Sequence, residues 1–190
     1  MIEIELEPIW RGDIQQKIFR QLLDCFALPG TIADLSNFLD DSPALLGVLA
    51  VLLDASVLFN DNGKLLQNRE RRLLRAKEVE ISEANFVVVD ATNPPPADFT
   101  PNLGTLPSPE KGATIVLQGS TLGEGDANLK LTGPGIPGYR SVKISGFDSA
   151  WWLARREWVI DFPLGVDFLL LDRTKVMAIP RTTQIVISNK

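Results

Sequence analysis

The N-terminal part of the chain shows two different spacings of its apolar residues. Residues 2–7 alternate isoleucine or leucine with glutamate, which is the period of a strand with one solvent-exposed face. In residues 13–26 the apolar positions follow helical spacing, and Pro29-Gly30 ends that pattern. Asp13 followed by Gln16 resembles a capping box at the start of this segment. We therefore predict a strand followed by an amphipathic helix.

The longest apolar run covers residues 44–59. Ser42-Pro43 precedes it as an N-cap with proline at the first helical position, and the turn-forming residues 60–63 follow it. The run contains Asp54 and is shorter than the ~20 apolar residues that a membrane span needs. It predicts a buried helix. A further helix is expected over residues 64–77.

Prolines and glycines dominate the centre of the chain. Six of the 13 prolines lie within residues 91–111, a density that excludes helix and sheet and predicts a long loop. Eight of the 14 glycines lie within residues 112–146, among short β-branched runs such as Ala113 to Leu117, and this mixture predicts strands joined by tight turns. Residues 119–125 lack the Gly-Lys-Ser/Thr of a P-loop, so a β-turn connector is expected there.

The C-terminal part returns to regular patterns. Residues 147–160 carry an apolar stripe at helical spacing, formed by Phe147, Trp151, Ala154 and Trp158. Strands are predicted over residues 166–171, 176–179 and 184–187, and the first is interrupted only by Asp167, as in a central strand buried on both faces. Alternating helices and strands in 190 residues favour a single α/β domain over residues 1–190.

The residue types that are missing restrict the chemistry. The chain has no histidine and one cysteine, which excludes histidine-based catalysis, cysteine-histidine pairs, histidine-ligated zinc or iron, and a four-cysteine zinc site or iron-sulfur cluster built by this chain alone; no metal site is expected. Cys25 lies in the apolar stripe of the first predicted helix, where a buried, unreactive thiol is favoured over a nucleophile. No signal or transit peptide is visible, so a cytoplasmic location is expected.

Charge is distributed unevenly. The net charge is −5 and the pI is about 4.8, which opposes binding to nucleic acid. Residues 64–77 nevertheless hold six basic residues and one acid. This segment could meet a phosphate-bearing ligand or an acidic partner, or it could be a solvated helix face.

Two short segments are candidates for binding phosphate. Gly133 and Gly135 flank a proline and could hold an anion with their amides, although a structural turn is the simpler interpretation. Arg181, Thr182 and Thr183 place a guanidinium and two hydroxyls before a strand. Arg181 could instead form a structural pair with Asp167.

The last predicted helix also offers a candidate interface. Trp152, Arg155 and Arg156 share a face that differs from the Trp151 stripe, and an exposed tryptophan beside arginine is typical of interface anchors. The alternative is a tryptophan lying on its own surface with cation-π contact from arginine.

Five blocks of sequence resemble one known family in order and spacing. The blocks are FRQLLDCFALPGTI (19–32), PSPEKGATIVLQ (107–118), KLTGPGI (130–136), FPLGVDFLLLD (162–172) and AIPRTT (178–183). They resemble the PhnH family, whose members are subunits of the bacterial carbon-phosphorus (C-P) lyase system that degrades phosphonates.

The resemblance implies a fold and a role. The expected fold is a three-layer α/β sandwich with a mixed sheet, similar to PLP-dependent transferases but without the cofactor. The expected role is a non-catalytic subunit, homodimeric in isolation, of a core complex with PhnG, PhnI and PhnJ. That complex makes alpha-D-ribose 1-methylphosphonate 5-triphosphate from ATP and methylphosphonate, and the family assigns PhnH no catalytic residue, metal or cofactor. The alternatives are a nucleotide- or phosphonate-binding subunit that contributes a phosphate site, and an independent PLP-type transferase.

Overall fold

The computed structural model describes residues 7–189, so the strand predicted over residues 2–7 lies outside the described residues except for Glu7. The strands are β1 (Ile32–Asp34), β2 (Leu58–Asp61), β3 (Lys77–Glu78), β4 (Phe86–Asp90), β5 (Thr114–Gln118), β6 (Thr121–Thr132), β7 (Arg140–Ser145), β8 (Asp167–Leu171), β9 (Lys175–Ile179) and β10 (Gln184–Asn189). The helices are α1 (Gly12–Ala27), α2 (Ser36–Leu39), α3 (Ala44–Leu52), α4 (Asn68–Leu74) and α5 (Ala150–Trp158), with 3-10 turns η1 (Pro8–Trp10), η2 (Ile81–Glu83) and η3 (Pro109–Lys111).

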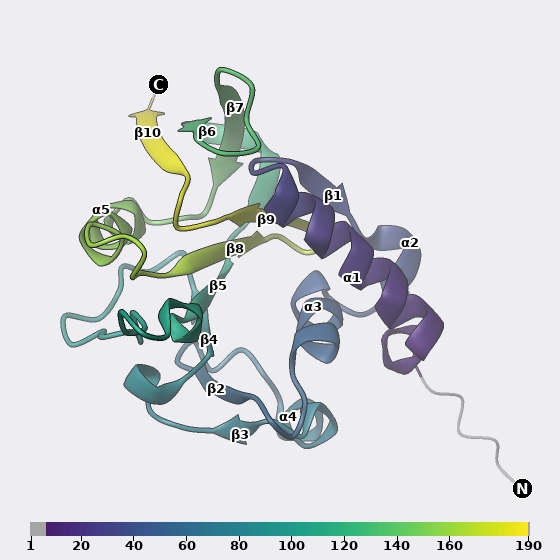
Figure 1. Cartoon of the computed structure of the whole chain (residues 1–190). Helices are drawn as coiled ribbons and strands as arrows, with labels where there is room; N and C mark the ends of the chain where they lie inside the picture. Colours follow the sequence, from purple (N-terminus) through teal and green to yellow (C-terminus); the bar gives the residue numbers. More distant parts are fainter. Residues whose placement is uncertain (1–6, 190) are drawn as a thin grey trace, which may run out of the picture.

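Within residues 7–189, seven strands form one mixed sheet in the order β1-β9-β8-β5-β4-β2-β3. The strands from β8 to β3 are parallel, β9 is antiparallel to β8, and β1 is antiparallel to β9. The remaining three form a small antiparallel sheet in the order β10-β6-β7 (Figure 1). The predicted α/β class with a mixed sheet is confirmed.

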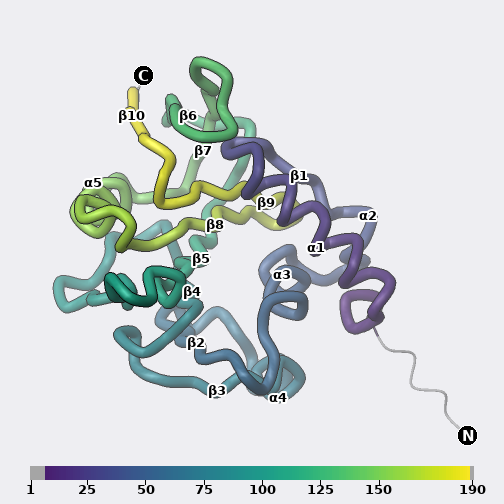
Figure 2. The backbone as a smooth tube through the Cα atoms, in the orientation of Figure 1, coloured from purple at the N-terminus to yellow at the C-terminus, as the bar shows by residue number. Residues whose placement is uncertain are grey.

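The central strands β4, β5 and β8 of the large sheet are buried on both faces, and their side chains alternate between two cores. Val88 on β4 packs in the core that α1 and α3 cover, whereas its neighbours Val87 and Val89 pack in the core beneath α5 and the small sheet. Figure 2 shows α1 running along β9 on one side and α5 on the other. The same alternation runs along β8, which confirms residues 166–171 as a central strand buried on both faces.

The boundaries of α1 and α3 differ from the sequence prediction. The run over residues 44–59 is not one helix: α3 ends at Leu52 and β2 begins at Leu58. Asp54 Oδ1 accepts hydrogen bonds from the Ser56 amide (2.7 Å) and hydroxyl (2.6 Å), and this local turn competes with the helix. Pro43 is the N-cap residue of α3, which begins at Ala44, whereas the sequence pattern placed this proline at the first helical position. The predicted capping box at Asp13 is absent because α1 already begins at Gly12, which places Asp13 inside the first turn, where its carboxylate pairs with Arg11.

The basic segment forms a shorter helix than predicted. Helix α4 covers only Asn68–Leu74, because Gln67 and Glu70 form a capping box at its start and Arg75 ends it in the left-handed region at φ +60°. Helix α5 is confirmed within residues 147–160, and residues 176–179 and 184–187 are confirmed as β9 and β10.

The long loop predicted over residues 91–111 is confirmed as far as residue 108, and the 3-10 turn η3 covers Pro109–Lys111. Phe99 from this loop packs edge-on against Trp151 at 5.2 Å. The turn expected over residues 119–125 is wrong for most of its length, since β6 begins at Thr121 and shifts register against β7 between Leu122 and Ala127.

No helix within the described part of the chain has the length and apolar character to cross a bilayer.

Candidate functional site

The two groups of candidate residues from α5 and from the turn before β10 meet in one pocket. Its volume is about 780 Å³, and Trp152, Arg155 and Arg156 line it from the helix. Residues 181–183 line it from the turn. Pro134 also contributes to the wall, but Gly133 and Gly135 do not.

Arg181 is a structural residue, as the pairing alternative predicted. Its Nη2 lies 2.7 Å from Asp167 Oδ2 and its Nε 3.3 Å from Asp167 Oδ1. Its Nη1 donates to the carbonyl oxygens of Pro109 (2.8 Å) and Pro163 (3.3 Å). Because these bonds use four of the five guanidinium N–H groups, little of Arg181 is left to hold a phosphate.

The glycines of the proposed anion loop are explained by close packing of the backbone. Gly133 has φ +136°, and a Cβ there would lie 3.0 Å from the carbonyl oxygen of Thr182. A Cβ at Gly135, which has φ +79°, would overlap the carbonyl oxygen of Ala27. These contacts favour the structural-turn interpretation over an anion cradle.

The expected exposure of Trp152 is wrong. Its side chain is only 6% exposed and lies between Phe147 and Phe168, with ring centroids at 6.2 and 6.1 Å. The sequence pattern suggested one buried face, but α5 packs two neighbouring faces against the core. Leu153 and Phe162 are the exposed apolar groups at the pocket, at 66% and 65%.

Arg155 is buried without a carboxylate partner among the described residues. It is 3% exposed and lies over the Phe168 ring, 5.6 Å from its centroid. Its Nη2 donates to the Pro180 carbonyl oxygen at 2.6 Å, but its Nε has no hydrogen-bond partner. Burial lowers the pKa of Arg155 to about 10, which the charge of Asp167 partly opposes. The side chain therefore remains a cation at neutral pH.

Thr183, like Arg155, is buried and has a polar side-chain atom without a hydrogen-bond partner. The residue is 2% exposed, and its amide donates to the Pro180 carbonyl oxygen at 2.9 Å. Its Oγ1 has no partner. The sequence placed Arg155 and Thr183 in separate candidate sites, and it gave no signal for Val159, Phe162, Ile185 and Ile187, which form the apolar part of the wall.

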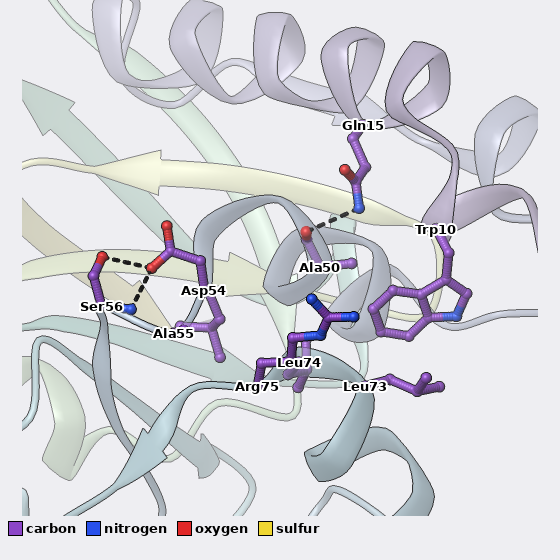
Figure 3. Close-up of a pocket in the computed structure, with 10 residues that line it drawn as sticks. Trp10, Gln15, Ala50, Asp54, Ala55, Ser56, Leu73, Leu74 and Arg75 are labelled. Carbon is purple, nitrogen blue, oxygen red and sulfur yellow. Dashed lines mark hydrogen bonds between the residues drawn. The ribbon is translucent and has the colours of Figure 1, made fainter.

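A second hollow of about 580 Å³ lies beside η1 and α4 (Figure 3). Two of its polar side chains are occupied within the fold: Gln15 Nε2 donates to the Ala50 carbonyl oxygen at 3.1 Å, and Asp54 is turned toward Ser56. Trp10 Nε1, in contrast, is buried without a hydrogen-bond partner. Among the described residues the hollow therefore has one such atom, whereas the pocket between α5 and β10 has two.

Comparison with protein families gives a match over residues 10–186 to the family described as bacterial phosphonate metabolism protein (PhnH). The chain belongs to the PhnH family. The named relatives agree with this assignment. A protein of Stutzerimonas stutzeri named C-P lyase subunit protein HtxG is 40% identical over 93% of this chain and 88% of its own length. The Rhizobium meliloti (strain 1021) subunit PhnH of alpha-D-ribose 1-methylphosphonate 5-triphosphate synthase is 29% identical over 94% and 92%.

In this PhnH-family chain the cysteine is part of the core. Cys25 is fully buried, and its Sγ donates to the Val176 carbonyl oxygen at 3.7 Å. Burial raises the pKa of the thiol to about 11. A protonated, inaccessible thiol cannot act as a nucleophile, in agreement with the sequence-based interpretation.

The basic segment of this PhnH-family chain contains one clearly structural arginine. Arg71 pairs with the buried Asp61 and with Glu78, each at 2.5 Å. Asp61 also accepts the amides of Leu65 and Leu66, both at 3.0 Å. Part of the local positive charge is therefore used to fasten α4 to β2.

Proposed function

We propose that this chain is a non-catalytic subunit of a C-P lyase core complex, assembled with PhnG, PhnI and PhnJ subunits. In this role it takes part in making alpha-D-ribose 1-methylphosphonate 5-triphosphate from ATP and methylphosphonate, in the cytoplasm. The observation that carries the proposal is the family match over residues 10–186, supported by two relatives that are both named as subunits.

The chemical inventory supports a non-catalytic role. The chain has no histidine, and its one cysteine is a buried thiol with a raised pKa. Arg181, the best sequence candidate for handling phosphate, is bound to Asp167. We therefore assign the bond-breaking chemistry to the partner subunits, with no cofactor on this chain.

We further propose that the fold is a three-layer variant of the PLP-dependent transferase architecture that has lost its cofactor. The large sheet, with α1 and α3 on one face and α5 with the small sheet on the other, supports this proposal. A homodimer is proposed for the isolated subunit. Sedimentation equilibrium tests the dimer, and a monomer at all concentrations would exclude it.

Copurification tests the subunit role. The tagged chain is co-expressed with PhnG, PhnI and PhnJ from the same host, and a stoichiometric complex is expected after affinity and size-exclusion steps. Formation of the ribose triphosphate product is then compared with and without this subunit, because an accessory subunit alters yield or assembly without acting alone. Failure to recover any complex under gentle conditions would overturn the proposal.

A further inference from the structure

Two unpartnered polar groups lie on one wall of the pocket between α5 and β10. Arg155 Nε and Thr183 Oγ1 are both buried without a hydrogen-bond partner, in residues that are 3% and 2% exposed and that both line this pocket. Buried polar groups in folded proteins are almost always hydrogen-bonded, because leaving one unpaired costs free energy. Two such atoms, in residues that line the same cavity, indicate a missing partner.

The guanidinium of Arg155 is held rigidly in place. Nη2 is fixed by the Pro180 carbonyl oxygen, and the group lies over the Phe168 ring. The neighbouring carboxylate of Asp167 is already bound to the backbone amide and guanidinium of Arg181. The positive charge of Arg155 is thus left without a counterion of its own among the described residues.

The charged side chains that line the pocket are all basic. Arg155 and Arg156 line it beside Arg181, whose charge is balanced by Asp167, and no aspartate or glutamate lines it among the described residues. The chain as a whole carries a net charge of −5, so this cluster runs against the overall balance. An anion is therefore the ligand that the pocket attracts.

The remaining wall is largely apolar. It includes Trp152, Val159, Phe162, Ile185 and Ile187. A volume of about 780 Å³ lies within the range of small-molecule sites. A bare inorganic ion would leave most of these side chains without contact, so the ligand has an apolar body beside its charged head.

We infer that this pocket binds a small organic oxyanion, whose head is held by the side chains of Arg155 and Thr183 and whose apolar body lies against Val159, Phe162, Ile185 and Ile187. The head is a carboxylate or a phosphonate, since both accept hydrogen bonds from a guanidinium and a hydroxyl. The site does not depend on the proposed subunit role.

Calorimetric titration of the full chain tests the inference. The probes are phenylphosphonate, benzoate, benzyl alcohol and inorganic phosphate. At least one of the two aromatic anions is expected to bind, at least tenfold more tightly than the neutral alcohol and than inorganic phosphate, and the preferred anion identifies the head group. The inference is overturned if neither aromatic anion binds, or if the alcohol or inorganic phosphate binds equally well.

Substitutions locate the site. Arg155→Met and the isosteric Thr183→Val are each expected to weaken the preferred anion at least tenfold, whereas Arg20→Met and Thr100→Val, at exposed positions outside the pocket, leave its affinity unchanged. If Arg155→Met fails to fold, Thr183→Val decides the question alone. Wild-type affinity in the folded pocket variants would place the anion elsewhere and refute the inference. Copurification of these variants with the partner subunits reports separately on assembly.

Discussion

Arg181 and Asp167 form a two-point ion pair at the start of β8, with Nη2–Oδ2 at 2.7 Å and Nε–Oδ1 at 3.3 Å. The same guanidinium binds the carbonyl oxygens of Pro109 and Pro163. One side chain therefore joins the end of the proline-rich loop, the segment after α5 and the turn after β9.

Arg181→Ala is expected to lower the free energy of unfolding by about 3 kcal/mol, because it leaves Asp167 and two carbonyl oxygens without their donor. The two side chains are only 13% and 20% exposed. Urea unfolding followed by circular dichroism measures the loss. Arg173→Ala, which removes an exposed hydrogen bond to the Asp41 carbonyl oxygen, is the control and should cost less than about 1 kcal/mol. Equal effects of the two substitutions would contradict the role of Arg181.

Gly112→Ala should destabilise the same junction by steric overlap. A Cβ at Gly112 would overlap the carbonyl oxygen of Gly165 and lie 2.8 Å from Arg181 Nη1. Overpacking of this kind costs about 1–3 kcal/mol. Gly12→Ala is the matched control, since a Cβ there meets nothing within 4 Å. Thermal unfolding should show a lower midpoint for the first variant only.

Asp61→Asn tests the buried pair beneath α4. The Asp61 side chain is fully buried, and its charge is balanced by Arg71. We expect a loss of about 3 kcal/mol in chemical denaturation, since the substitution breaks a buried pair. Arg69→Ala removes the exposed pair with Glu7 and should change stability by no more than about 0.5 kcal/mol. A larger effect for Arg69 than for Asp61 would refute this ranking.

Cys25 is expected to make the free energy of unfolding depend on pH in the alkaline range. Burial raises the pKa of the thiol from 9.0 to about 11, so below pH 9 the thiol is protonated in both the folded and the unfolded chain. Between pH 9 and 11 only the unfolded chain loses the proton, and stability falls by roughly 3 kcal/mol over this window. Cys25→Ala should lack this decrease when its unfolding free energy is compared with wild type across the same pH range. Parallel curves for the two proteins would contradict the assignment.

The elements predicted well from sequence are those whose burial follows one period. Helix α1 has one apolar stripe, and β8 is a continuous apolar run, so each pattern has a single interpretation. The single helix predicted over residues 44–59 was wrong, because uniform hydrophobicity does not distinguish a buried helix from a buried strand. The boundary was set by a side-chain hydrogen bond from Ser56 to Asp54.

The candidate site was only partly predicted from the sequence, for a different reason. Helix α5 lies in a corner, so Trp151 and Trp152 are both buried although they point to different faces. No helical pattern with one buried side could place Arg155 in the core. The pairing of Arg181 with Asp167, in contrast, was predictable, because a lone carboxylate in an apolar strand needs a nearby cation.

The pairing of β1 with β9 bears on how the chain folds as it is synthesised. Ile32 pairs with Met177, and the amides of Leu35 and Ala44 donate to the carbonyl oxygens of Thr174 and Arg173. The partners of these segments are therefore translated long after the segments themselves. Such distant contacts slow folding and leave apolar surface open to misassembly while the polypeptide is unfinished. The apolar stripe of α1 therefore stays uncovered until β9, against which it packs, has left the ribosome.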